Sequence, residues 1–227
     1  MTPRCGSTLL TEWLESARVF GLPAEYLNAD LGSGADRWHL GSGIERWAAI
    51  VREFELPEYL RAVLRVTQSS NGVTGVKVDF GRALPVIACG GFAEIATEVK
   101  YIYLTRRDLL GQAISAHRAI ITGSWSSRDP ELAEPVFDLA AICGQLVSLT
   151  NQMAYWERYF ALRGIQPLRL LYEEIVGDCE GTVRKVAEFL GVREAIAYGS
   201  VTTRVSQQRN AINDEWRALV LAAMQQV

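Results

Sequence analysis

The sequence VKYIYLTRRDLLGQAISAHRAI, residues 99–120, joins a strand pattern to a helix pattern with no linker between them. Residues 99–105 are dense in β-branched and aromatic side chains, which predicts a strand. From Leu109 onward apolar residues recur at helical spacing, which predicts an amphipathic helix. Strands that alternate with helices are typical of an α/β fold with a mainly parallel sheet, and we expect that fold here.

The same alternation continues on both sides of this unit. The other expected elements are helices at about 7–20, 44–51, 57–66, 136–162 and 180–192, a last helix in the tail, and strands at 73–80 and 165–172. The sequence contains no repeat, low-complexity tract or linker, and 227 residues suit one folding unit. We therefore expect a single domain over residues 1–227.

Several polar residues follow the predicted strands directly. Lys77 and Asp79 lie at the end of the first strand pattern, and Arg106 and Arg107 follow the second. In open α/β sheets, ligands bind at the carboxyl ends of the strands. We expect these four residues and the opening loop to share one edge of the sheet.

Charge and cysteine usage narrow the class of protein. A net charge of −3 argues against nucleic-acid binding, which usually needs a broad basic surface. Cys5, Cys89, Cys143 and Cys179 are far apart, which disfavours a disulfide framework or a zinc site. The sequence has neither an apolar run of about 18 residues nor the pattern of a signal peptide, so we expect a cytoplasmic protein without a transmembrane segment.

The opening stretch TPRCGSTLL, residues 2–10, has the character of an anion-binding loop that leads into a helix. Gly6 permits close approach of the backbone, Ser7 and Thr8 add hydroxyl groups, and Arg4 adds a positive charge. A Walker A loop would also need an upstream glycine and a lysine, and both are missing here. The stretch taken alone leaves an ordinary loop as an equal alternative.

A second candidate anion site lies in YLTRRDLLGQAIS, residues 103–115. The guanidinium group of Arg106 or Arg107 and the hydroxyl of Ser115 could together hold a separate phosphate. The alternative is that either arginine pairs with Asp108 or with a helix end.

The two stretches together resemble the 5′-phosphosulfate loop and the 3′-phosphate motif of sulfotransferases that use 3′-phosphoadenosine-5′-phosphosulfate (PAPS). LRLLYEEIVGDCEGTVRKVAEFLGV is similar to the downstream tyrosine-glutamate strand and helix of that family. GLPAEYL, VTGVKVDF, RRDLLGQAIS and TGSW resemble the bacterial branch of trehalose 2-sulfotransferases. The resemblance extends from residue 2 to about residue 192 and is more specific than any single motif.

This resemblance implies a sulfotransferase fold, a P-loop-like parallel sheet flanked by helices. Members usually have a strand ahead of the phosphosulfate loop, and we expect that first strand to be missing here. The resemblance implies PAPS as the co-substrate, with no metal, and an acceptor hydroxyl on a carbohydrate or glycolipid. The implied donor-binding residues are Arg4, Cys5, Gly6, Ser7, Thr8, Arg106 or its rival Arg107, Ser115 and Arg209.

On the acceptor side, the resemblance places the general base at Glu25 in PAEYL. Sulfuryl transfer requires a group that removes the acceptor proton and cations that stabilise charge on the departing phosphate. Arg4 and Lys77 could supply that charge, although Lys77 could instead extend to the surface. Tyr26 and Trp125 are candidate acceptor contacts, and Trp125 could equally be a core residue.

Other interpretations remain open. The missing lysine counts against a P-loop kinase, because nothing would neutralise the transferred group. A degenerate or N-terminally truncated sulfotransferase that binds a nucleotide without turnover is a further alternative, and the related branch suggests a possible homodimer. His117 is expected to be a packed histidine. The aromatic residues expected in the core are Trp13, Trp47, Trp156 and Phe160.

Overall fold

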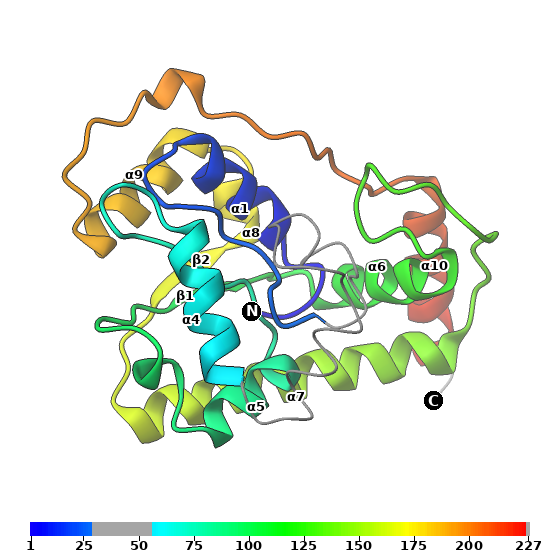
Figure 1. Ribbon diagram of the computed structural model, residues 1–227. Coiled ribbons are helices and arrows are strands. Elements are labelled where there is room, and N and C mark those ends of the chain that lie inside the picture. The colour runs from blue at the N-terminus through cyan, green and yellow to red at the C-terminus, as the bar shows by residue number, and fades with distance from the viewer. Residues whose placement is uncertain (29–55, 226–227) are drawn as a thin grey trace.

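The computed structural model describes residues 1–28 and 56–225, and it shows helices around a small parallel sheet (Figure 1). Strands β1 (Ile102–Thr105) and β2 (Leu168–Leu171) pair in parallel, with Ile102 opposite Leu168 and Thr105 opposite Leu171. The strands expected at 99–105 and 165–172 are therefore confirmed, as is the α/β fold.

The helices flank this pair of strands and account for most of the described chain. Their bounds are α1 Ser7–Ser16, α4 Leu56–Thr67, α5 Phe80–Ala88, α6 Leu109–Thr122, α7 Leu139–Arg163, α8 Tyr172–Ile175, α9 Cys179–Leu190 and α10 Ala211–Met224, with 3₁₀ turns at Phe92–Glu94 and Tyr198–Ser200. Helix α1 ends at Ser16, four residues before the expected end, because the chain turns at Arg18, which has φ +63°. The helix expected at 44–51 lies outside the described residues.

The strand expected at 73–80 is wrong. Its only pairing in the described chain is a single parallel bridge between Val76 and Ala24, with the Lys77 N–H donating to the Ala24 carbonyl at 2.8 Å. The side chain of Asp79 accepts a hydrogen bond from the Arg82 N–H at 3.0 Å and caps helix α5. The helix cap therefore ends the extended segment where the sequence pattern would have continued it.

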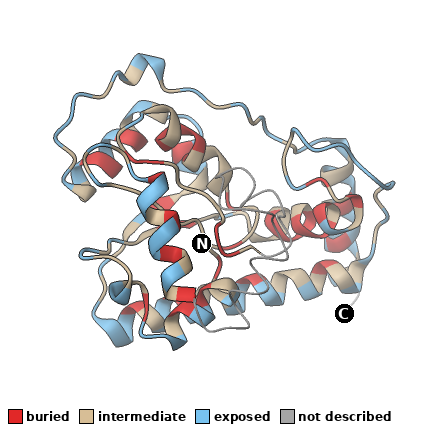
Figure 2. Ribbon diagram, in the orientation of Figure 1, coloured by how far each residue is buried: buried red, intermediate tan, exposed pale blue. Residues whose placement is uncertain are grey.

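The two faces of the sheet pack against different helices. Leu104 and Leu170 lie in an apolar cluster with α1 and α9, whereas Tyr103 lies with Trp156 and Phe160 of α7 and with Ala83 of α5. In Figure 1, α1 and α9 lie above the strands and α5 and α7 lie below them. A third cluster joins α6, α7 and α10, and Figure 2 shows buried residues concentrated along these contacts.

The core expectations for Trp13, Trp156 and Phe160 are confirmed, since all three are buried. Trp47 lies outside the described residues. His117 is also buried, with Nε2 3.2 Å from the Val136 carbonyl oxygen and its ring 5.6 Å from the ring of Trp216. It is the packed histidine that the sequence suggested.

Residues 1–6 form turns and coil that lead into α1. The Met1 amino group donates to the Val78 carbonyl at 3.2 Å, and Trp156 Nε1 donates to the Met1 carbonyl at 3.1 Å. The absence of the family's first strand and the single-domain organisation stay predictions. Among the described helices, none is long and apolar enough to span a membrane.

Candidate active site

A cavity of about 800 Å³ opens where β1 and β2 end. It is lined by the opening loop, residues 22–26 and 28, Lys77, Asp79, Arg106, the loop at 125–129 and the tail at 203–209. Its volume lies in the range usual for small-molecule sites. Lys77, Asp79, Arg106 and the opening loop share this edge as expected and line the cavity. Arg107 also follows the end of β1, but it does not line the cavity.

The opening loop delivers the first turn of α1 to the cavity. Gly6 is the residue before the helix and has φ +87°, and a Cβ atom on it would lie 2.3 Å from Cδ2 of Tyr172. Only glycine fits both conditions. Ser7 and Thr8 therefore begin the helix at the cavity wall, where the free N–H groups of a first turn attract anions. The Cys5 side chain is buried in the apolar core, so it can offer only backbone groups.

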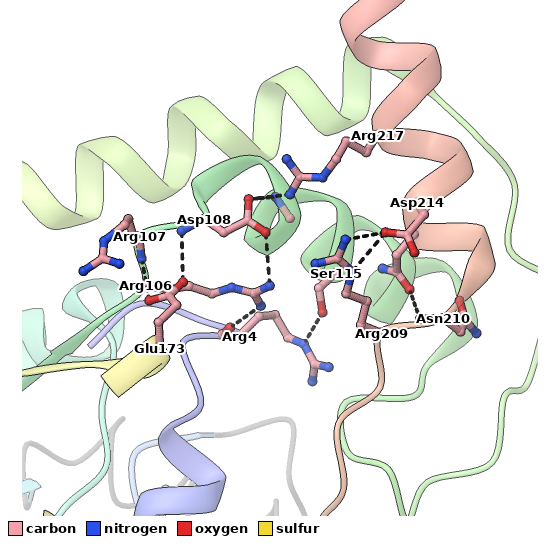
Figure 3. A network of polar contacts seen from close by, with 12 residues as sticks. Arg4, Arg106, Arg107, Asp108, Ser115, Glu173, Arg209, Asn210, Asp214 and Arg217 are labelled. Atoms are coloured by element: carbon pink, nitrogen blue, oxygen red, sulfur yellow. Dashed lines mark hydrogen bonds and ion pairs between the residues drawn. The ribbon is translucent and has the colours of Figure 1, made fainter. Parts of the chain in front are cut away.

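Arg4 reaches across the cavity to three segments distant in sequence, and Figure 3 shows its contact with one of them, at Ser115. Its Nε donates to Ser115 Oγ at 2.9 Å, and its other nitrogens donate to the Trp125 carbonyl and to the Gln208 side-chain oxygen. Burial and the neighbouring charge of Arg106 lower the pKa of Arg4. Arg4 and Ser115, which the resemblance assigned to different phosphates, are thus in direct contact.

Arg106 and Arg107 point in different directions. The Arg106 side chain is 13% exposed, and its guanidinium carbon lies 5.1 Å from the centre of the Tyr172 ring. Its NH1 donates to the Arg4 carbonyl at 3.5 Å, while its buried Nε has no hydrogen-bond partner. Arg107 is 71% exposed and lies 3.9 Å from Glu174, and Figure 3 shows it directed away from Arg4. Of these two arginines, only Arg106 therefore places its guanidinium group in the cavity.

Asp108 links this group to the last helix. Its carboxylate lies 3.6 Å from Arg106 NH2, accepts from Arg217 of α10, and accepts from the Gly111 N–H at 3.0 Å. Burial alone would raise the pKa of Asp108, but the bonds from Arg217 and Gly111 hold it below its ordinary value. Pairing of Arg106 with Asp108, the alternative to phosphate binding, is therefore present as a long contact. The sequence had not indicated Arg217.

The corner between β1 and α6 is held by Glu173 of α8, the short helix that directly follows β2. Glu173 accepts hydrogen bonds from the backbone N–H groups of Arg107 at 3.0 Å and Asp108 at 3.1 Å. Burial opposes ionisation of Glu173, yet these two bonds lower its pKa overall. Tyr172 and Glu173, the pair noted in the tyrosine-glutamate motif, thus support Gly6, Arg106 and the start of α6.

A second group of charged side chains meets the first turn of α1. The Lys77 ammonium lies 2.9 Å from Glu25 Oε1 and donates to Thr8 Oγ1 at 3.1 Å. The other oxygen of Glu25 accepts from Asn28 Nδ2 at 3.0 Å. The carboxylate is therefore oriented from two sides, and the ammonium lies between it and the first turn of α1. Lys77 does not extend to the surface, since its side chain is 12% exposed.

The remaining candidates lie at the wall and rim. Tyr26 is 2% exposed, and its hydroxyl donates to the Leu22 carbonyl. Trp125 is 46% exposed and so is not a core residue. Arg209 is a rim residue whose Nε donates to Asp214 at 3.0 Å. Within residues 1–28 and 56–225, no group of three or more His, Cys, Asp and Glu side chains could hold a metal ion.

The first turn of α1, with Arg4 before it and Arg106 at the end of β1, gives the cavity donors of the kind that bind phosphate or sulfate groups. The chain belongs to the Stf0 sulphotransferase family, whose profile matches residues 88–219, more than half of its length. It is a sulfotransferase of the trehalose 2-sulfotransferase-like branch.

Two relatives support that placement. The trehalose 2-sulfotransferase of Mycobacterium tuberculosis (strain ATCC 35801 / TMC 107 / Erdman) is 25% identical over 243 residues, which covers 95% of this chain and 90% of the relative. The trehalose 2-sulfotransferase of Mycolicibacterium smegmatis (strain ATCC 700084 / mc(2)155) is 26% identical over 244 residues, with 94% and 89% coverage. Both alignments extend beyond residues 88–219 and span nearly the whole chain.

Proposed function

We propose that this sulfotransferase transfers a sulfuryl group from PAPS to a hydroxyl of a carbohydrate, and that Glu25 is the general base. The observation that carries the proposal is that the Lys77 ammonium contacts both the Glu25 carboxylate and the Thr8 hydroxyl. These two contacts set an oriented carboxylate beside an anion-binding helix start, in the same cavity as Arg4 and Arg106. The names of the two relatives make trehalose the first acceptor to test.

The donor side of the proposal uses the two arginines that enter the cavity. Arg4 and the N–H groups of Gly6, Ser7 and Thr8 bind the 5′-phosphosulfate. Arg106 and Ser115 bind the 3′-phosphate, and the orphaned Nε of Arg106 is the donor that an anion would satisfy. Arg209 closes the rim over the nucleotide. Arg107 has no part in binding, because its side chain points to solvent.

The chemical step is a displacement at sulfur. The acceptor oxygen forms a bond to sulfur, its proton passes to Glu25, and the bond between sulfur and the bridging phosphate oxygen breaks. The products are the sulfate ester and adenosine 3′,5′-bisphosphate. Lys77 and Arg4 stabilise the charge that develops on the leaving phosphate, and a positioned base contributes about 10²–10⁴-fold to the rate.

On the acceptor side, Trp125 is the aromatic residue that could stack on a sugar ring, because nearly half of its surface is free. Tyr26 is buried, so its role is to support the segment that carries Glu25. The acceptor therefore lies between Glu25 and the loop at 125–129.

The test combines binding with turnover. Adenosine 3′,5′-bisphosphate should raise the melting temperature more than ATP with magnesium does, and [³⁵S]PAPS should label trehalose faster than sucrose or maltose. A larger shift with ATP and magnesium would overturn the donor assignment in favour of a kinase. Binding of the bisphosphate without transfer to any member of a sugar and glycolipid panel would instead identify a nucleotide-binding protein without turnover.

A further inference from the structure

The tail between the 3₁₀ turn Tyr198–Ser200 and α10 is a strap over the cavity, defined here as residues 202–209. Figure 1 shows it as the orange trace that crosses the molecule from the α9 side to α10. Within the described chain, this strap makes no backbone–backbone hydrogen bond to any other segment. Its position therefore depends on side chains that reach it from elsewhere.

Glu12 on α1 accepts three hydrogen bonds from the strap, and Ser16 Oγ on the same helix accepts one from the Thr202 N–H at 3.1 Å. Glu12 Oε2 accepts from Thr203 Oγ1 at 2.7 Å, from the Arg204 N–H at 2.6 Å and from the Val205 N–H at 3.2 Å. Glu12 Oε1 lies 3.1 Å from Arg128 and 3.8 Å from Arg204 Nε. One carboxylate thus joins α1 to the strap and to the loop at 125–129.

The Glu12 carboxylate is buried, so it depends on its partners in the strap and in the loop at 125–129. Glu12 is 7% exposed, and a buried carboxylate is costly unless it is paired. Burial raises its pKa, but the bonds from Thr203 and Arg204 and the charge of Arg128 lower the pKa overall, so the group is ionised at neutral pH. All of these partners belong to the strap and the adjacent loop, and none belongs to the apolar core beneath α1.

The far end of the strap reaches the donor site. The Ser206 N–H donates to Ser127 Oγ at 2.9 Å, and Gln208 donates to Ser124 Oγ at 3.4 Å. The side-chain oxygen of Gln208 accepts from Arg4. A strap that moved away from Glu12 would take Gln208 away from the arginine at the centre of the cavity.

We propose that Glu12 is a positioning residue for the donor site: it anchors the strap over the cavity and thereby keeps Gln208 on Arg4. The identity of the nucleotide rests on the proposed function, but the anchoring itself does not. Glu12 touches neither the donor nor the acceptor in this scheme, and it acts through the strap and through Arg128 of the adjacent loop.

The experiment compares Glu12→Ala, Glu12→Gln and Thr203→Val with the unaltered chain. Glu157→Gln is the matched control, because it also neutralises a carboxylate paired with an arginine, at 2.6 and 2.8 Å from Arg169, away from the cavity. Hydrogen exchange of residues 202–209 is measured without ligand. The dissociation constant for adenosine 3′,5′-bisphosphate and the kcat and KM for PAPS are then determined.

We expect Glu12→Ala to speed exchange in the strap and to weaken bisphosphate binding by about ten- to hundredfold, the usual effect of losing hydrogen bonds to a charged group. KM for PAPS should rise while kcat at saturation stays within about threefold, because the loss is one of binding. Glu12→Gln keeps an acceptor oxygen, so its strap exchange and its bisphosphate affinity should lie between those of Glu12→Ala and the unaltered chain. Glu157→Gln should match the unaltered chain in all three measurements.

Unchanged strap exchange in a folded Glu12→Ala chain would overturn the anchoring. A rise in exchange spread evenly over the molecule, with a fall in melting temperature and no change in bisphosphate affinity, would also overturn it. If Glu12→Ala does not fold, the same measurements are made on Thr203→Val. This substitution removes the donor to Glu12 Oε2 and the acceptor of the Val205 N–H, which still donates to Glu12. If the unaltered chain fails to bind the bisphosphate, the proposed function fails, and the strap exchange decides the anchoring separately.

Discussion

Arg106 and Arg107 are adjacent in sequence but occupy different environments. The side chain of Arg106 is enclosed between Tyr172 and Arg4, with its Nε unsatisfied, whereas that of Arg107 lies in solvent near Glu174. Arg106→Ala should therefore weaken binding of adenosine 3′,5′-bisphosphate by about ten- to hundredfold. Arg107→Ala should change it by less than about twofold, because exposed charge pairs contribute little. Isothermal titration of the two variants is the measurement, and an equal loss in both would contradict the assignment.

Glu25 is the residue on which turnover should depend most strongly. Glu25→Gln keeps the shape of the side chain, and its oxygen can still accept a hydrogen bond from Asn28. It cannot take the proton from the hydroxyl of the acceptor sugar. We expect kcat to fall by about 10²–10⁴-fold while the affinity for adenosine 3′,5′-bisphosphate changes little. Single-turnover assays at saturating PAPS measure this. Glu58→Gln, at an exposed position on α4, is the control and should retain full activity.

At the scale of elements, α1 and α6 both bring their first turns to the same cavity. Helix α1 begins at a glycine that packs on Tyr172, and α6 begins at Asp108, whose side chain caps it. Glu173 on α8 accepts from the backbone at the α6 corner. The start of α8, directly after β2, therefore supports both helix starts. Tyr172 lines the cavity itself, whereas Glu173 acts through the backbone of the α6 corner.

Gly6→Ala tests this element directly. The substitution places a Cβ at φ +87° and 2.3 Å from the Tyr172 ring, so either α1 or the ring must shift. The backbone conformation alone should cost about 1–2 kcal/mol, and the clash adds to it. Gly144→Ala is the control, because nothing lies within 4 Å of its Cβ position in α7. It should leave stability unchanged or raise it by up to about 1 kcal/mol. Urea denaturation measures both, and equal stabilities would contradict the packing argument.

At the scale of the whole molecule, three carboxylates join segments that are distant in sequence. Glu12 joins α1 to the strap, Asp108 joins α6 to α10, and Glu173 joins the end of β2 to the start of α6. Each has a pKa below its ordinary value, 4.5 for the glutamates and 3.8 for the aspartate. The unfolded chain therefore binds more protons than the folded chain in the acidic range.

The consequence is an acid-sensitive fold. Because the folded pKa values are depressed, the stability that these groups contribute is present above their ordinary values and is lost as the pH falls toward the folded values. We expect the melting temperature to be nearly constant from about pH 7 to about pH 5 and to fall below about pH 4.5. Scanning fluorimetry across this range measures it. Glu173→Gln should flatten the acidic limb, and an unaltered slope in that variant would remove Glu173 from the explanation.

Much of the fold could be predicted because it rests on local patterns. Strands β1 and β2 and helices α4, α6, α7 and α9 follow from β-branched runs and helical spacing, which each segment carries by itself. The strand at 73–80 was predicted wrongly, because whether an apolar segment pairs depends on its neighbours and not on its own composition. There Asp79 starts a helix instead. The contacts of Arg4 with Ser115 and Gln208 connect residues more than 100 positions apart, and no spacing rule predicts them.

The sequence by itself determined the class of fold, the glycine-containing loop that leads into α1, and the family, since motif order and residue type are enough for these. The tertiary structure decided which arginine enters the cavity, that Lys77 joins Glu25 to Thr8, and that Glu12 holds the strap. The reason is geometric. A local pattern sets the direction of a backbone element, but the direction of a side chain at its end depends on the packing of every element around it.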